Sequence, residues 1–290
     1  MSFTIFGDSS CNLPKAQQLA FGIEMLDFSY EMEGKLVRCP RYPDDFDGKA
    51  YYDYLRNGGM VKTSLLGVGT IMDEFQPHLE KGEDILYITM SSNISGTHNA
   101  ACQAARLLKE EYPDREVRVF DSMGSGLGTG LLVGRASDYR ALGRTLDETW
   151  DLLVTDCANL CEFFTVDDLQ FLKRTGRVSG VTATLGNMLQ LKPLLRGDET
   201  GHIVAFNKVR GRKKSLDTLL DLYRKRAIDP QNQRVYISHG DCPEDAQYVA
   251  DGIRAIAEPK ELIVALHEPL TGAHVGPGMM AVFFLSDGRI

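Results

Sequence analysis

The sequence predicts an α/β protein, with an N-terminal doubly wound parallel-sheet domain at residues 1–150 and a C-terminal two-layer α/β domain with a mixed sheet at residues 151–290. Three observations predict this. The chain has 290 residues, enough for two domains. In its first half, strand-like apolar runs alternate with helical patterns, which is typical of a parallel sheet. In its second half strands outnumber helices, and two of them are expected to form a hairpin.

The first half begins with a strand at Phe3–Phe6. Asp8, Ser9 or Ser10 then caps a helix entered through Pro14. The following elements are expected in chain order: apolar segments at Ile23–Tyr30 and Lys35–Arg38 joined as a hairpin, a helix at Asp44–Asn57, a short element at Met60–Ser64, a helix ending near Lys81, a strand at Asp84–Met90, a helix at Thr97–Glu111, a strand at Val117–Phe120 and a helix ending near Leu142.

The second half is expected to start with a helix near Leu146. Its later elements, in order, are the end of that helix at Leu160, a strand at Glu162–Val166, a turn at Thr175–Arg177, a hairpin around Gly197–Gly201, a helix at Arg212–Ala227, a strand at Arg234–Ser238, a helix at Pro243–Ala257, a strand at Glu261–Leu266 and a closing strand at Met279–Leu285. No internal repeat or low-complexity linker interrupts this order.

Composition excludes several classes of protein. The net charge of −8 disfavours nucleic acid as a partner, because that affinity depends on neutralising phosphates. No apolar run approaches the ~20 residues that span a bilayer, so no integral membrane segment is expected. The six cysteines form no CxxC pair, which argues against a zinc site and a disulfide framework. With no leader pattern before Phe3, we expect a cytoplasmic protein.

Charge is unevenly distributed along the chain. Residues 173–226 hold 13 Lys and Arg against 4 Asp and Glu, whereas the remainder holds 19 against 36. This predicts a basic face on an acidic protein. A docking surface and an ordinary solvated surface with ion pairs explain that face equally well.

Hydroxyl and other small polar residues recur after predicted strands and before predicted helices. The groups are Asp8 with Ser9 and Ser10; Thr63 with Ser64; Ser91, Ser92, Asn93, Ser95 and Thr97; and Asp121 with Ser122. In an open parallel sheet, ligands bind at this edge, where helix N-termini offer free N–H groups. Lys62 is the only basic residue beside these groups, so the expected ligand is a carboxylate held by neutral donors. Each group alone is also explained as a helix cap.

Known catalytic motifs are missing or incomplete. SSNISGT at residues 91–97 lacks the glycine frame of GxSxG, so a serine hydrolase is not supported. GSGLGTG at residues 124–130 misses the third glycine of a dinucleotide-binding GxGxxG loop. The sequence contains neither GxxxxGK[ST] nor HExxH. We therefore expect no phosphorylation by this chain alone, and no cofactor.

Two residues stand out as candidates for chemistry outside the hydroxyl groups. Arg177 follows a glycine in KRTGRVSG, a turn that is able to direct the guanidinium into a crevice between the domains. His274 lies in GAHVGPGMM, where glycines and a proline predict an irregular loop before the last strand. The alternatives are a surface arginine and a structural histidine. His239, at a strand end, is a weaker candidate.

Read together, several segments resemble the DegV family. They are FGDSSCNLP, VKTS, SSNISGT, FDS, DDLQFLKRTGRVSG, LQLKPLL, KVRGRKKS and HVGPGM, and they run in order from the first strand to the last. The resemblance implies a fatty-acid-binding subunit of the bacterial fatty acid kinase system. A separate kinase, similar to dihydroxyacetone kinase, would phosphorylate the carboxylate of the bound long-chain fatty acid to an acyl phosphate for phospholipid metabolism.

The resemblance also implies roles for individual residues. Thr63 and Ser95 would bind the carboxylate, with Ser64 and Ser92 as supporting donors. Arg177 and His274 would act at the phosphoryl-transfer end, and Arg210 would belong to the surface that meets the kinase. No metal ligand is implied. In place of the family's usual Gln-Pro, Leu65 and Leu66 follow Ser64 here, so we expect a different start of the next helix and a different pocket entrance.

Two other functions remain open from the residues alone. The first is a stand-alone enzyme that acts on a small carboxylated or phosphorylated metabolite with His274 and Arg177. The second is a regulatory module that docks another protein through the basic segment.

Overall fold

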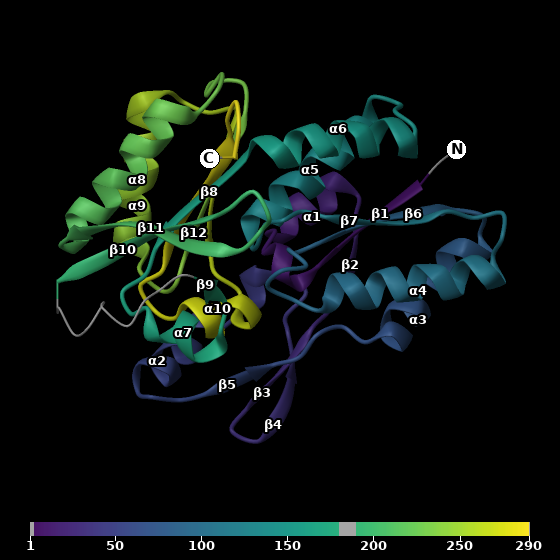
Figure 1. The fold of residues 1–290 in the computed structure, drawn as a ribbon, viewed down its shortest axis with the longest axis horizontal. Coiled ribbons are helices and arrows are strands. Elements are labelled where there is room, and N and C mark those ends of the chain that lie inside the picture. The colour runs from purple at the N-terminus through teal and green to yellow at the C-terminus, as the bar shows by residue number, and fades with distance from the viewer. Residues whose placement is uncertain (1–2, 180–189, 290) are drawn as a thin grey trace.

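The computed structural model describes residues 3–179 and 190–289 (Figure 1). Two residues of the family-like segments lie outside the described residues: Gly180, the last residue of DDLQFLKRTGRVSG, and Leu189, the first residue of LQLKPLL. Within the described part, no helix is long and apolar enough to cross a membrane. The division of the chain near residue 150 stays a prediction.

The first half contains the expected parallel sheet, in the order β2-β1-β6-β7. Its strands are β1 (Phe3–Asp8), β2 (Glu24–Leu26), β6 (Asp84–Thr89) and β7 (Val117–Asp121). Successive side chains of β1 point to opposite faces: Phe6 packs into one hydrophobic cluster and Ile5 into another. Both faces are apolar because helices cover both, as is usual for parallel sheets.

Helices α3 (Val68–Glu80) and α4 (Thr97–Glu111) pack on the Phe6 face. On the other face lies α5 (Leu127–Ala141), together with α1 (Lys15–Phe21) and α6 (Leu146–Asn159). The bounds of α4 agree with the sequence prediction. Most of α5 is buried, because it packs against the parallel sheet on one side and against strands of the second half on the other.

The second half forms a mixed sheet, in the order β13-β12-β14-β8-β10-β11-β9. The strands are β8 (Leu160–Thr165), β9 (Val178–Ser179), β10 (Leu191–Gly197), β11 (Ile203–Arg210), β12 (Arg234–His239), β13 (Glu261–Leu266) and β14 (Met280–Leu285). Helices α8 (Arg212–Arg226) and α9 (Pro243–Ile256) cover one face, and α5 packs against the other (Figure 1). The predicted α/β class and mixed sheet are confirmed, as is the hairpin of β10 and β11.

One strand lies in an unexpected sheet. The sequence placed Thr63 and Ser64 at the end of a parallel strand, but β5 (Val61–Thr63) pairs with β3 (Ser29–Met32) in a small antiparallel sheet completed by β4 (Lys35–Arg38). That prediction was wrong, because a three-residue strand carries no pattern that tells parallel from antiparallel pairing.

Helical segments also differ from expectation. The loop predicted around His274 is a helix, α10 (Pro269–Val275), which begins at a proline capped by Glu268. A short helix, α7 (Gln170–Thr175), precedes the predicted turn, where Gly176 adopts φ +68°. The helix expected at Asp44–Asn57 is shorter, since α2 covers only Gly48–Arg56.

Two further predictions were wrong. The segment Ile23–Tyr30 holds β2 of the parallel sheet and the start of β3 of the small antiparallel sheet, and Asp8 caps a short turn at Ser9–Cys11, not the helix that follows Pro14. The other strands and helices start and end within a few residues of their predicted bounds.

Candidate functional site

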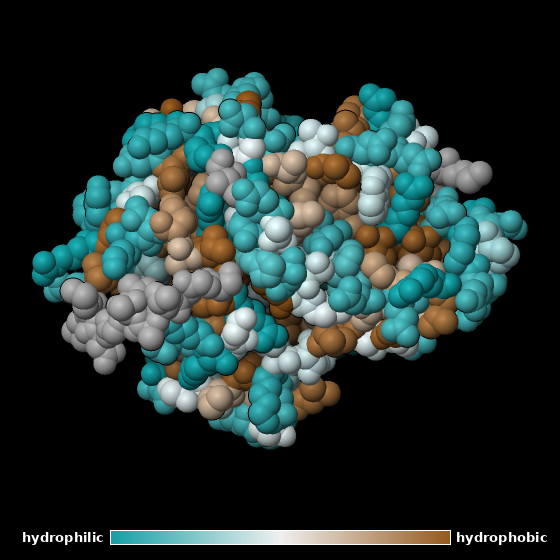
Figure 2. All heavy atoms as spheres, in the orientation of Figure 1, coloured by the Kyte–Doolittle hydropathy of each residue, from teal (hydrophilic) through white to brown (hydrophobic). Residues whose placement is uncertain are grey.

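A cavity of about 250 Å³ lies where the elements of the two halves meet. It is lined by the end of β5, the residues just before α4, one face of α10 and the paired strands β8 and β14. The face of the molecule shown in Figure 2 is hydrophilic at its periphery and has hydrophobic patches in its central part. The cavity itself is mostly apolar, with polar side chains at two places.

Hydroxyl groups from two separate segments form the first polar place. Thr63, Ser64 and Ser95 all line the cavity. Ser95 precedes α4, donates to Thr97 Oγ1 over 3.1 Å and accepts from the Thr97 N–H over 3.2 Å. The N-terminus of α4, a helix of 15 residues, therefore opens at the cavity wall, where its dipole favours an anion.

His274 and Arg177 lie at the same end of the cavity. The His274 Nε2 atom is 3.0 Å from Thr63 Oγ1. Burial, with a further contribution from the nearby Arg177 charge, lowers the pKa of His274 to about 4. At neutral pH the imidazole is uncharged, so Arg177 supplies the positive charge here.

The face of α10 that lines the cavity is held by a chain of buried hydrogen bonds. Glu268 accepts from the backbone N–H groups of Leu270 and Thr271 and from the Thr271 hydroxyl. The ring of His267 joins Thr271 Oγ1 to Ser238 Oγ over 2.7 Å on each side. Burial lowers the pKa of His267 to about 3 and raises the pKa of Glu268 to about 7. His267 is thus a neutral group that fixes α10 in position.

An apolar wall leads away from the hydroxyl groups. Ala281 and Phe283 of β14, and Met279 just before it, alternate along the chain and line the cavity, and Phe164 of β8 pairs with Ala281. Four residues of strand cover roughly 13 Å, so the wall extends well beyond the polar end. An apolar ligand anchored at Thr63 would lie along this wall.

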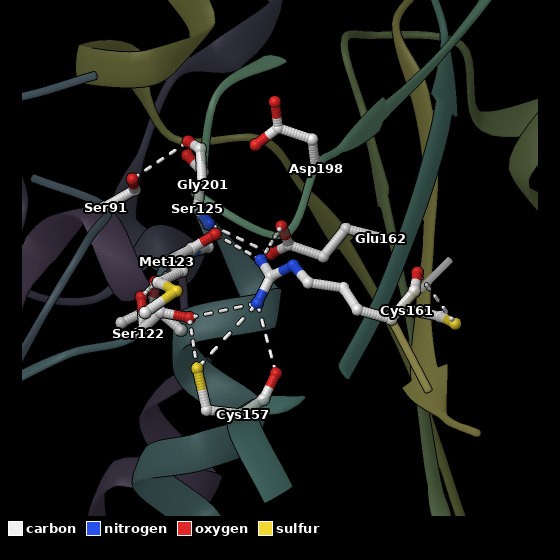
Figure 3. A network of polar contacts seen from close by, with 12 residues as sticks. Ser91, Ser122, Met123, Ser125, Cys157, Cys161, Glu162, Asp198 and Gly201 are labelled. Carbon is white, nitrogen blue, oxygen red and sulfur yellow. Dashed lines mark hydrogen bonds and ion pairs between the residues drawn. The ribbon is translucent and has the colours of Figure 1, made fainter. Parts of the chain in front are cut away.

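The wall ends at the second polar place, a buried ion pair. Glu162 pairs with Phe283 across the strands and binds the Arg289 guanidinium, with 3.2 Å between Oε2 and Nη2. Burial raises the pKa of Glu162, although Arg289 opposes this shift. Backbone groups complete this network: the Ser125 N–H donates to Glu162, and the carbonyls of Met123 and Cys157 accept from Arg289 (Figure 3). Both charged side chains are less than 10% exposed.

Two predicted site residues lie outside the cavity. The backbone N–H of Ser92 donates to the Asp121 carboxylate, and Ser92 does not line the cavity. Arg210 is exposed at the end of β11 and donates to Gln190. The weaker candidate His239 accepts from the Cys242 N–H at the start of α9, as a cap does. The cavity wall brings together the other five predicted site residues, Thr63, Ser64, Ser95, Arg177 and His274. Their roles stay predictions.

Several of the hydroxyl groups are used for structure instead. Ser91 Oγ donates to the carbonyl of Gly201 over 2.9 Å, and Asn93 Nδ2 donates to that of Thr200 over 2.6 Å. These bonds fasten the tip of the β10–β11 hairpin to the first half of the chain, and Figure 3 shows the one between Ser91 and Gly201. Asp8 is buried, where Ser10 and Tyr87 donate to it.

Sequence reasoning missed four polar residues that line the cavity: Ser125, Glu162, His267 and Thr271. A glutamate inside the apolar run LCEFFTV was a signal for Glu162, since a charge within a buried strand needs a partner. Glu268-Pro269 was the signal for α10, because an acidic cap before proline is typical of a helix start. Because the sequence analysis predicted a loop in place of α10, it gave no position to His267 and Thr271.

The comparisons with known proteins agree with this fold. Residues 2–287 match the family model described as uncharacterised protein, DegV family. A DegV domain-containing protein of Clostridium perfringens is 36% identical over 99% of this chain and 98% of its own length. A second relative, from Streptococcus pyogenes, is 30% identical over 99% of both chains.

Two solved structures are similar over nearly their whole length. One is a DegV family protein from Thermus thermophilus, described by its fatty acid binding, with 26% identity, a TM-score of 0.88 and coverage of 99% of this chain and 100% of that one. The other is DegV from Bacillus subtilis, described as a fatty acid binding protein, with 25% identity, a TM-score of 0.85 and 99% coverage of both. This chain therefore belongs to the DegV family.

Proposed function

We propose that the protein binds one long-chain fatty acid, with its tail in the cavity and its carboxylate against Thr63, Ser64 and Ser95. The observation that carries the proposal is the arrangement of the cavity: hydroxyl donors, a helix N-terminus and one cation meet at one end of a mostly apolar space. The Thermus thermophilus and Bacillus subtilis relatives, described as binding fatty acids, support it.

The physical chemistry of the ligand fits the two parts of the cavity. Each buried methylene contributes about 0.8 kcal/mol before ordering is subtracted, so the tail supplies most of the affinity. The carboxylate needs donors that replace water, because burying an unpaired charge is strongly unfavourable. Thr63 and Ser95 supply neutral donors, and Arg177 supplies the compensating charge.

We further propose that the bound carboxylate is presented to a separate kinase similar to dihydroxyacetone kinase. A carboxylate oxygen would attack the γ-phosphorus of ATP held by that kinase, giving ADP and an acyl phosphate for phospholipid metabolism in the cytoplasm. Arg177 is exposed beside the carboxylate site, where its charge would stabilise the phosphoryl group in transfer. His274, neutral and bonded to Thr63, would keep that hydroxyl oriented.

The carboxylate site is tested with the double variant Thr63→Val/Ser95→Ala. Two hydrogen bonds to a charged group are lost, each of about 1.5 kcal/mol or more, so fatty acid binding is expected to weaken by about 100-fold. Titration of delipidated protein with a long-chain fatty acid measures this. Ser92→Ala is the control, because Ser92 lies outside the cavity. Equal affinities of all three proteins would refute the assignment.

A further inference from the structure

A second cavity lies behind the ion pair that ends the first. It measures about 600 Å³ and has an apolar part formed by Val119, Phe120, Trp150 and Val154. Phe120 and Trp150 meet edge to face, with 5.0 Å between ring centroids. Arg289 lines this second cavity, whereas its partner Glu162 lines the first. The ion pair is therefore part of the wall between them.

The loop beside the ion pair completes that wall. Ser125 lines the first cavity and Met123 lines the second, two residues away. The Ser125 N–H donates to Glu162 Oε1 over 3.0 Å, and the Met123 carbonyl accepts from Arg289. Arg289 also donates to the Cys157 carbonyl over 3.1 Å. With these partners, the pair is fixed from both sides (Figure 3).

Glycines leave the space that the Glu162 side chain occupies. A Cβ atom on Gly128 would lie 1.9 Å from Glu162 Oε1, and one on Gly124 would lie 2.6 Å from it. A Cβ on Gly197 would lie 3.0 Å from Oε2 and 3.2 Å from Arg289 Nη2. Gly124 and Gly128 belong to GSGLGTG, the segment whose glycine pattern did not fit a dinucleotide loop. Here they allow a charged side chain to pack in the wall.

We propose that the Glu162–Arg289 ion pair is the inner stop of the acyl channel and sets the longest chain that the protein accepts. The inference rests on the proposed function and deepens it. An acyl chain anchored at Thr63 runs along Met279, Ala281 and Phe283 toward Glu162. Its methyl end makes no hydrogen bonds, so it stops at a paired carboxylate that it has no means of replacing. This pair and the adjoining loop lie between the acyl chain and the apolar part of the second cavity.

The test is the double variant Glu162→Ala/Arg289→Ala, which removes both charges and so leaves neither buried alone. Binding is measured for saturated fatty acids from about 12 to about 24 carbons, a series in which every added methylene can gain burial only while apolar space remains. The unaltered protein is expected to lose affinity sharply beyond one length. The double variant is expected to bind acids beyond that length at least about tenfold more tightly than the unaltered protein does.

The matched control is Arg135→Ala/Asp156→Ala. This pair joins α5 to α6, with 2.8 Å between Arg135 Nε and Asp156 Oδ2, and lines neither cavity. Its length profile should equal that of the unaltered protein. If Glu162→Ala/Arg289→Ala does not fold by circular dichroism, Glu162→Gln/Arg289→Leu keeps most of the volume and should extend the limit by a smaller step.

The outcomes separate the two proposals. The same length limit in the folded charge-removal variant and in the unaltered protein would overturn the inference while leaving fatty acid binding intact. A shift of the same size in the Arg135→Ala/Asp156→Ala control would also overturn it. Failure of the unaltered protein to bind any fatty acid would refute the proposed function, and the inference with it.

Discussion

His274 is held in an uncharged state by its surroundings. Burial and the neighbouring Arg177 charge both disfavour a second positive charge, so its pKa falls from 6.5 to about 4 in the folded protein. In the unfolded chain the ordinary value applies. Between pH 6.5 and 4 the unfolded state therefore binds a proton that the folded state does not, and this contribution to stability is lost as pH falls.

The prediction is that His274→Gln flattens the pH dependence of stability in this window. Relative to the unaltered protein, the fall in unfolding free energy between pH 6.5 and pH 4 should shrink by up to about 3 kcal/mol. Glu268, whose raised pKa of about 7 gives the opposite slope between pH 4.5 and 7, is present in both proteins and cancels in the difference. Urea unfolding at several pH values measures this; parallel curves would contradict it.

The sequence located part of the site at the level of single residues. It predicted correctly that hydroxyls from separate segments come together, since Thr63 and Ser95 lie 32 positions apart and line one cavity. The hydroxyl pattern by itself did not distinguish Ser95 from Ser91, because both follow the same strand; only the family resemblance singled out Ser95. Which of them faces the cavity depends on the hairpin tip that Ser91 binds, and that contact joins residues 110 positions apart.

At the scale of elements, strongly patterned helices and strands were predictable and short ones were not. The 15 residues of α4 carry a clear apolar face, and its bounds were predicted correctly. The seven residues of α10 are nearly all buried, so they show no amphipathic period. Its position comes from tertiary contacts, such as the Tyr52 hydroxyl bonded to the His267 carbonyl.

Strand β11 and helix α8 carry the basic segment to the surface. The exposed basic residues on these two elements include Lys208, Arg210, Lys214, Arg224 and Lys225. Because Arg210 forms a hydrogen bond with the neutral Gln190 side chain, its charge is not neutralised there. An acidic surface of the proposed kinase would be attracted to this charge.

We expect Arg210→Glu to weaken the complex with the kinase by at least about tenfold, chiefly through slower association that depends on salt. Surface plasmon resonance at two salt concentrations measures both rates. Arg106→Glu is the control, since Arg106 is an exposed arginine of α4, outside the basic segment. Equal effects of the two substitutions would show that overall charge, and not this surface, governs docking.

At the scale of the whole molecule, the cavity depends on both halves of the chain. Helix α5 packs between the two large sheets, and one hydrophobic cluster includes Ile5 from the parallel sheet and Phe283 from the mixed sheet. Hydroxyl donors come from the first half, and the apolar wall comes from the second. The sequence predicted two α/β units, but the packing that forms the cavity between them involves contacts too distant in sequence to predict.

The most direct measurement of the central claim is mass spectrometry of an organic extract from the purified, folded protein. If the cavity binds the tail and the hydroxyl end binds the carboxylate, the extract should contain long-chain fatty acid at about one molecule per chain, and extract from Thr63→Val/Ser95→Ala should contain much less. Repeated preparations of folded protein without fatty acid, which also bind none when it is added, would contradict the claim.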